Sequence, residues 1–62
     1  MWIFKKPNKT SKEYFRSGTE NYYFHLDLKK TIMDLKAAIT IDPNYSEAYF
    51  YLGLVYYVLT RF

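Results

Sequence analysis

The residues that could carry catalysis or hold a metal ion are few in this chain of 62 residues. His25 is the only histidine and there is no cysteine, which excludes a thiolate site, a multi-histidine site and a disulfide framework. The six acidic residues are scattered, and a catalytic base needs a nucleophile or a second acid close by. We therefore expect no enzyme activity, no cofactor and no metal, and we interpret His25 as a residue at a helix end.

Aromatic side chains are far more abundant, with eight tyrosines, five phenylalanines and one tryptophan making up 23% of the chain. Tyr and Phe also favour strands, but the sequence shows neither strict alternation nor an Asn-Gly or Asp-Gly turn. Two glycines and two prolines are also too few for a disordered or all-β chain. The composition therefore predicts an all-α fold whose aromatic side chains fill a core or bind a partner.

The positive charge is concentrated at the amino-terminal end. The formal net charge is +3, and four lysines within the first twelve residues carry +4, so the remainder carries −1. We predict a flexible basic tail at residues 1–10, with too few cations and aromatics to anchor on a membrane by itself. No secretory pattern is present, and the uncharged run 48–60 is shorter than the about 20 residues that span a bilayer. These features predict a cytoplasmic protein that binds neither membranes nor nucleic acid.

Polar residues at helix starts predict three helices, at residues 11–25, 28–41 and 45–60. Thr10 is followed three residues later by Glu13, which is the pattern of a capping box. Asn44 and Glu47 repeat this pattern before the third helix. Pro43 ends the second helix, because the residue before a proline disfavours helical backbone.

The second and third helices differ in how many apolar faces they carry. Asp27 is predicted to cap the second helix, whose single apolar stripe consists of Leu28, Ile32, Leu35, Ala38 and Ile39. The third helix is apolar nearly all round, so it requires cover on more than one side. The side expected to face the second helix carries Tyr49, Leu52, Tyr56 and Leu59. The opposite side carries Phe50, Leu54, Tyr57 and Val58, and predicts self-association through residues 46–62.

The two capping boxes reveal an internal repeat of 34 residues. The same offset pairs Phe15 with Tyr49, and Tyr22 with Tyr56. A helix, a turn, a second helix and a proline-marked turn within 34 residues form one unit of a helical solenoid.

At these positions the sequence resembles the tetratricopeptide repeat family. The opening half of the family's pattern matches Tyr49-x-x-Leu52-Gly53-x-x-Tyr56, with Phe62 where the family has a later aromatic. The closing half matches Leu35, Ala38 and Pro43, with Thr31 where a small Ala is expected. The resemblance covers residues 12–62 and implies antiparallel helix-turn-helix repeats that start a right-handed superhelical solenoid. Residues 11–43 would form a first repeat, and residues 44–62 the first helix of a second, truncated repeat.

The first helix fits the family pattern in two registers. A gapless alignment places Thr19 at the family's glycine position, and the capping boxes and Tyr22 favour it. The alternative places Gly18 there and needs one inserted residue near His25 and Leu26. We adopt the gapless register. We also expect Gly53 to allow close approach of a paired helix, so that Gly53→Leu would be more destabilising than Thr19→Leu.

The resemblance implies a protein–protein interaction scaffold, because the first helix of each repeat in this family lines a concave groove that binds peptide segments. The groove positions of the second repeat correspond to Glu47, Phe50, Leu54, Tyr57 and Val58. Those of the first repeat, in the gapless register, are Glu13, Arg16, Glu20, Tyr23 and Phe24. From these we take as candidate partner-binding residues Arg16, Tyr23, Phe50, Leu54 and Tyr57. The partner would be a protein or peptide and not a small-molecule substrate.

Three alternatives compete with groove binding. A neighbouring helix or another chain could cover the apolar groove positions. The chain could be a helical-repeat nucleic-acid binder whose aromatics stack on bases, although Glu13, Glu20 and Glu47 oppose this. It could also be a fragment of a longer protein with no independent function, because it ends where a second helix of the second repeat would begin.

Overall fold

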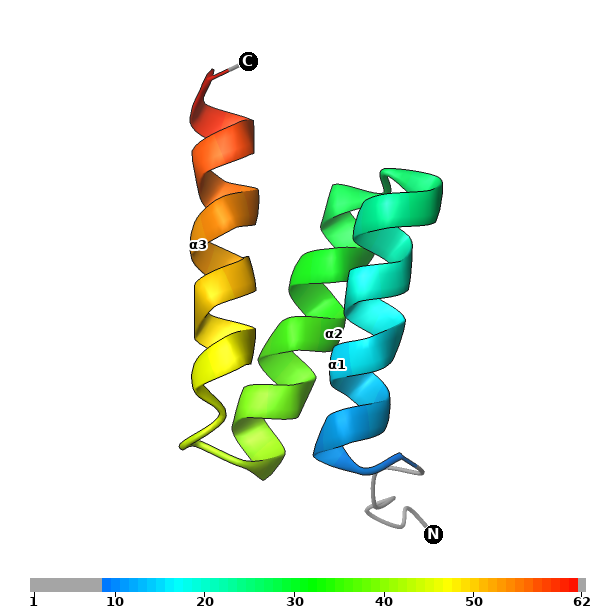
Figure 1. The fold of residues 1–62 in the computed structure, drawn as a ribbon, viewed down its shortest axis with the longest axis vertical. Coiled ribbons are helices and arrows are strands. Elements are labelled where there is room, and N and C mark those ends of the chain that lie inside the picture. Colours follow the sequence, from blue (N-terminus) through cyan, green and yellow to red (C-terminus); the bar gives the residue numbers. More distant parts are fainter. Residues whose placement is uncertain (1–8, 62) are drawn as a thin grey trace, which may run out of the picture.

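Residues 9–61 form three antiparallel helices, the first of which changes its winding in its last turn (Figure 1). The computed structural model describes these residues, and the predictions made for the segment 1–8 and for Phe62 lie outside the described residues. The elements are α1 (Ser11–Glu20), η1 (Asn21–His25), α2 (Leu28–Ile41) and α3 (Ser46–Arg61). No strand occurs within residues 9–61, and the predicted all-α class is confirmed.

The first two helices begin at the predicted capping residues. The Oγ1 atom of Thr10 accepts a hydrogen bond from the backbone N–H of Glu13 at 3.2 Å. The Oε1 atom of Glu13 accepts the backbone N–H of Thr10 at 2.8 Å, which completes the capping box. At the start of α2, Asp27 Oδ1 accepts the backbone N–H of Lys30 at 3.2 Å. Each of these bonds satisfies an N–H group that has no partner inside the helix.

The third helix begins differently from the prediction. Among the hydrogen bonds of residues 9–61, none joins Asn44 to Glu47, so the second capping box is wrong. Asp42 organises this turn instead: its Oδ1 accepts the backbone N–H of Asn44, and its carbonyl accepts that of Tyr45, both at 3.1 Å. The helix therefore starts at Ser46, one residue later than expected, and Glu47 lies in its first turn.

The core is centred on α2, which packs against α1 on one side and α3 on the other. Thr31, Leu35 and Ala38 of α2 are fully buried, as are Ala48 and Val55 of α3. The buried Thr31 hydroxyl donates to the carbonyl of Asp27 at 2.9 Å, so burial leaves it satisfied. The apolar stripe predicted for the second helix is confirmed at its centre.

The helices α1 and α2 approach each other closely at Gly18. A Cβ atom added to Gly18 would lie 3.2 Å from Cβ of Asp34 and 3.2 Å from two side-chain atoms of Leu35. Thr19 is only partly buried, and its hydroxyl donates to the carbonyl of Arg16 at 2.9 Å. The gapless register is therefore wrong, because Gly18 and not Thr19 occupies the close-contact position.

The π-helical segment η1 accommodates the extra residue that this register requires. The backbone N–H groups of Leu26 and Asp27 both point to the carbonyl of Asn21, the second at 3.0 Å. A π turn contains one residue more than an α turn, so the insertion expected near His25 is absorbed within the helix. The helix then ends at Leu26, whose φ of 50° and ψ of 33° lie in the left-handed region.

The face of α3 that meets α2 is rotated by about one residue from the predicted face, which is about 100° on a helix. Ala48 and Val55 are fully buried there, and Leu52 packs against the same core. The predicted inward set is right for Leu52 but wrong for Tyr49, Tyr56 and Leu59, which are 49%, 44% and 45% exposed. The small Ala48 and the β-branched Val55 let α3 approach α2 where tyrosines would hold it away.

Gly53 lies on an open side of α3. No atom is within 4 Å of a Cβ added at this position, so the close helix approach expected there is absent among the described residues. The predicted cost of Gly53→Leu is therefore wrong for this structure.

The two glycines are expected to respond oppositely to alanine. Gly53→Ala should raise the free energy of unfolding by about 1 kcal/mol, because Ala favours a helix interior and meets no neighbour. Gly18→Ala should lower it by about 1 kcal/mol, because the methyl group crowds Asp34 and Leu35. Urea unfolding of both variants checks this. Equal stabilisation by both substitutions would contradict the close approach at Gly18.

Leu26 offers a second test of the helix end. Leu26→Gly should raise the free energy of unfolding by about 1 kcal/mol, because left-handed backbone is unfavourable for residues with a Cβ atom. Leu26→Ala is the matched control, since it also removes the exposed side chain but keeps the Cβ atom. We expect no gain from the alanine. Identical unfolding curves for the two variants would show that the backbone conformation of Leu26 stores no such cost.

Candidate functional site

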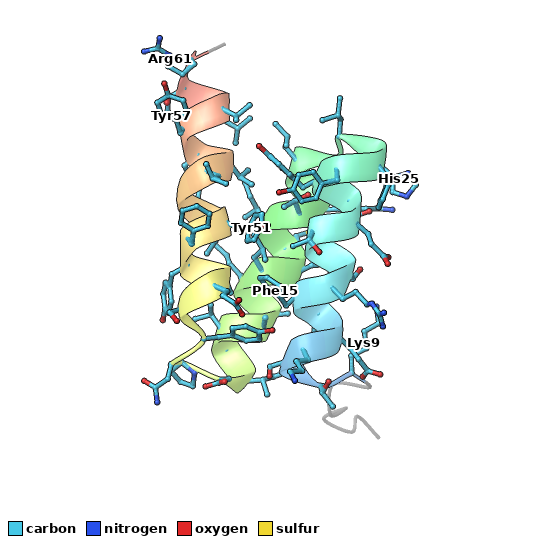
Figure 2. All side chains as sticks on the ribbon, in the orientation of Figure 1. Lys9, Phe15, His25, Tyr51, Tyr57 and Arg61 are labelled. Atoms are coloured by element: carbon cyan, nitrogen blue, oxygen red, sulfur yellow. The ribbon has the colours of Figure 1, made fainter. Side chains whose placement is uncertain are left out.

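Six aromatic side chains form a continuous aromatic strip from α1 and η1 across to α3. Its members are Phe15, Tyr22, Tyr23, Tyr45, Phe50 and Tyr51. Figure 2 shows Phe15 and Tyr51 in the space between the first and third helices. Neighbouring rings meet edge to face or stacked, which are the arrangements that favour aromatic pairs. The strip therefore links two helices whose backbones make few direct contacts.

Tyr51 is the centre of this strip. The centroid of its ring lies 5.6 Å from that of Phe15 on α1 and 6.1 Å from that of Tyr23 on η1. It also lies 5.6 Å from the ring of Phe50, its neighbour on α3. At the other end of the strip, Phe15 stacks on Tyr45 with centroids 5.0 Å apart. Tyr51 thus connects the aromatic rings of α1 and η1 with that of Phe50 on α3.

Two tyrosine hydroxyls meet within the aromatic strip. The Oη atoms of Tyr23 and Tyr51 are 3.1 Å apart and share a hydrogen bond. This bond is the main cause that raises the pKa of Tyr51, with partial burial and the nearby charge of Glu47 acting in the same direction. Burial, followed by the charges of Glu47 and Asp42, raises the pKa of Tyr45. With a raised pKa, the hydroxyls of Tyr45 and Tyr51 stay protonated at neutral pH.

A carboxylate fixes the helix that carries half of the aromatic strip. Asp34 Oδ2 on α2 accepts hydrogen bonds from Ser17 Oγ at 2.8 Å and from Asn21 Nδ2 at 2.9 Å. Ser17 precedes Gly18, and Asn21 opens η1. The rotation of α1 and η1 on α2 is thus set by the backbone contact at Gly18 and by these two bonds. Phe15 and Tyr23 are aimed at α3 as a result.

The structure brings together two of the five predicted partner-binding residues. Tyr23 and Phe50 both contact Tyr51 and are 59% and 64% exposed. Arg16 is exposed and lies apart from them, on the rim of a shallow hollow lined by Thr10, Lys12, Glu13, Phe15 and Tyr45. Leu54 is half-buried one turn beyond Phe50.

Tyr57 lies nearer the end of α3, where it is 58% exposed and the Arg61 guanidinium stands 5.4 Å from its ring centroid. Figure 2 shows both side chains on the side of α3 that faces away from α1 and α2. Within residues 9–61, no described contact joins Tyr57 to Tyr23 or Arg16. The predicted residues therefore form two neighbouring surfaces that share Phe50, and not a single pocket.

Phe15, Tyr45 and Tyr51 contribute to this surface but were absent from the predicted site. The alternative register, which places Gly18 at the family's glycine position, would have predicted Phe15. It shifts each groove position of α1 back by one residue, so that Phe15 takes the groove position assigned to Arg16. Tyr45 precedes α3 and Tyr51 follows Phe50, so a pattern built on helix positions does not select them. Their roles come from tertiary contacts with Phe15.

The part of the chain described by the structure shows no cluster of residues typical of metal binding. Within residues 9–61, no three His, Asp or Glu side chains gather where they could hold a metal ion. His25 is exposed on the outer side of η1 (Figure 2). None of the helices in this part is both long enough and apolar enough to cross a membrane.

Comparison with known proteins identifies a repeat family. The family model described as a TPR repeat matches residues 27–59, which include α2 and all but the end of α3. The match begins at Asp27, two residues after the end of η1, so it leaves out the first helix with its π turn. No curated protein and no solved structure matches the chain.

The hydroxyl pair should make stability depend on pH in the alkaline range. Because the pKa of Tyr51 is raised above its usual 10.0, its contribution to stability is present below pH 10 and is lost as the pH rises through the raised value. We expect the melting temperature of the wild type to exceed that of Tyr51→Phe at pH 8, and this difference to shrink above pH 10. A difference that stays constant over this range would contradict the role of the pair.

Proposed function

Because the chain belongs to the tetratricopeptide repeat family, we propose that it is a protein–protein interaction scaffold that binds a peptide or helix of another protein. The binding surface would comprise the aromatic strip and the adjoining outer face of α3, with Arg16, Tyr23, Phe50, Leu54 and Tyr57 in contact with the partner. Residues 11–43 would act as one repeat and residues 44–62 as the start of the next. A cytoplasmic location remains a prediction.

The observation that carries this proposal is the exposure of aromatic side chains on the aromatic strip and on the adjoining outer face of α3. Tyr23, Phe50 and Tyr57 are each more than half exposed although they lie on helices with a formed core. Exposed apolar patches of this kind mark interaction surfaces, and Tyr is among the residues that dominate binding energy at interfaces. Aromatic rings also lose little conformational freedom when they are covered, so they bind at a low entropic cost.

The polar groups around the aromatic strip suit a peptide ligand. The hydroxyls of Tyr23 and Tyr51 lie at the surface of the strip, where they can bond the carbonyl and amide groups of a peptide backbone. Arg16 and Glu13 border the hollow beside Phe15 and offer one charge of each sign to side chains of the partner. Peptides that dock on aromatic surfaces combine such backbone bonds with apolar contacts.

No catalytic role is proposed, and tetratricopeptide repeats typically act as scaffolds without enzyme activity. Nucleic acid is a poorer ligand because residues 13–62 carry a formal net charge of −1, without the excess of cations that binding to phosphate groups requires.

A peptide-display selection on the purified chain tests the proposal. We expect enriched peptides whose affinity falls by about tenfold or more when Tyr23 and Phe50 are both changed to alanine, because aromatic residues at the centre of an interface typically contribute at this level. Tyr56→Ala is the matched control, since Tyr56 is also an exposed tyrosine of α3 but lies outside the strip. Peptides that keep their affinity for the double variant and lose it with Tyr56→Ala would overturn the proposed surface.

A further inference from the structure

The outer face of α3 carries a regular stripe whose two ends bear opposite charges. This α3 stripe consists of Glu47, Phe50, Leu54, Tyr57 and Arg61, which follow one another at spacings of 3, 4, 3 and 4 residues. Such spacing keeps side chains on one face of a helix and is the spacing by which two helices pack along each other. Glu47 lies in the first turn and Arg61 in the last turn of α3, and both are exposed.

The α3 stripe is complementary to itself when its direction is reversed. If a second α3 is laid antiparallel with the two Leu54 residues opposite each other, Glu47 of each helix lies opposite Arg61 of the other. Phe50 then lies opposite Tyr57, because both lie about one turn from Leu54. A parallel arrangement would place Glu47 against Glu47 and Arg61 against Arg61, which is unfavourable.

We propose that the occupant of the α3 stripe is the α3 helix of a second copy of this chain, packed antiparallel about a two-fold axis at Leu54. This inference rests on the proposed function, since it names a partner for part of the proposed surface. Each copy would supply the same residues to both halves of the interface, as two-fold symmetry requires. Two Glu47–Arg61 pairs would close the ends of an apolar centre.

The surroundings of the α3 stripe leave room for this partner. Figure 2 shows Tyr57 and Arg61 directed away from α1 and α2, so neither helix of the same chain covers them. Phe50 is 64% exposed although its ring edge meets Tyr51. The guanidinium of Arg61 lies over the Tyr57 ring, which holds the charge on the stripe instead of leaving it free in solvent.

The expected complex is weak and reversible. A contact along a single helix of 16 residues is small, and interfaces below about 1,200 Å² in total are typical of transient association. Its ends are solvent-exposed ion pairs, so salt should weaken it. Association should therefore be measured by sedimentation equilibrium over a wide range of protein concentration at low ionic strength.

Charge reversal of single ends provides a direction-specific test. Glu47→Lys places like charges opposite each other at both ends of the antiparallel pair, and Arg61→Glu does the same with the opposite sign. Each variant alone should self-associate at least about tenfold more weakly than the wild type, since like charges facing each other are strongly unfavourable. An equimolar mixture should recover association to near the wild-type level, because the two variants present opposite charges to each other at both ends. The effects on the isolated helices are the same in the mixture and in the separate variants.

An introduced cysteine tests the position of the two-fold axis by a measurement that does not depend on charge. The chain has no cysteine, so Leu54→Cys creates one thiol for each copy. We expect rapid formation of a covalent dimer on mild oxidation, and at least about tenfold slower formation from Tyr56→Cys, which lies on another face. Circular dichroism of each variant checks that the helices are retained.

Two results would overturn the inference. One is a wild-type chain that stays monomeric at every concentration; the other is a mixture of the charge variants that associates no better than either alone. If the monomeric chain still binds display-selected peptides through Tyr23 and Phe50, the proposed function stands and only the self-pairing fails. If peptides do not bind but the antiparallel dimer forms, the surface is a self-association surface, and peptide binding is the part that fails.

Discussion

The contact between the α1 backbone at Gly18 and the side chains of Asp34 and Leu35 on α2 is the constraint on which the rest of the structure depends. A Cβ atom at this position would crowd Asp34 and Leu35 at 3.2 Å, so the close contact favours this face of α1 against α2. The hydrogen bonds from Ser17 and Asn21 to the Asp34 carboxylate hold the same orientation with polar groups. With that face fixed, Phe15 and not Arg16 is directed at α3, and the aromatic strip can form.

The helices α1 and α3 both pack against α2, but α3 leaves more of its apolar surface exposed to solvent. α1 is held on α2 by the glycine contact and by the Asp34 bonds, whereas α3 meets α2 through a narrow band that contains Ala48, Leu52 and Val55. The remaining sides of α3 carry more aromatic surface than residues 9–61 can bury. Because exposed aromatic surface is costly in water, it is most readily explained by binding. The exposed aromatic side chains of α3 are thus the feature that the proposed interaction role would explain.

Local sequence signals predicted the helices well and their relative rotation poorly. Thr10 with Glu13, and Asp27, are capping signals between near neighbours, and the structure has both. Pro43 likewise ends a helix through its own backbone. The rotation of α1, in contrast, differed by one residue between two plausible alignments, and both fitted the local pattern. The same applies to the candidate site, where Tyr23 and Phe50 were predicted but Phe15, Tyr45 and Tyr51 were not.

The sequence by itself determined the all-α class, the approximate limits of three helices, and the family to which the repeat belongs, because these follow from composition, from caps between near neighbours and from residue spacings along the chain. Only the tertiary structure decided that Gly18 is the close-contact residue, that the segment Asn21–His25 winds as a π-helix, and that Gly53 faces open space. The physical reason is that a rotation of about 100° leaves every local hydrogen bond of a helix intact but changes which side chains face the neighbouring helix. The rotation of a helix about its axis is decided by its packing against neighbouring helices. The sequence of one helix alone does not specify that packing.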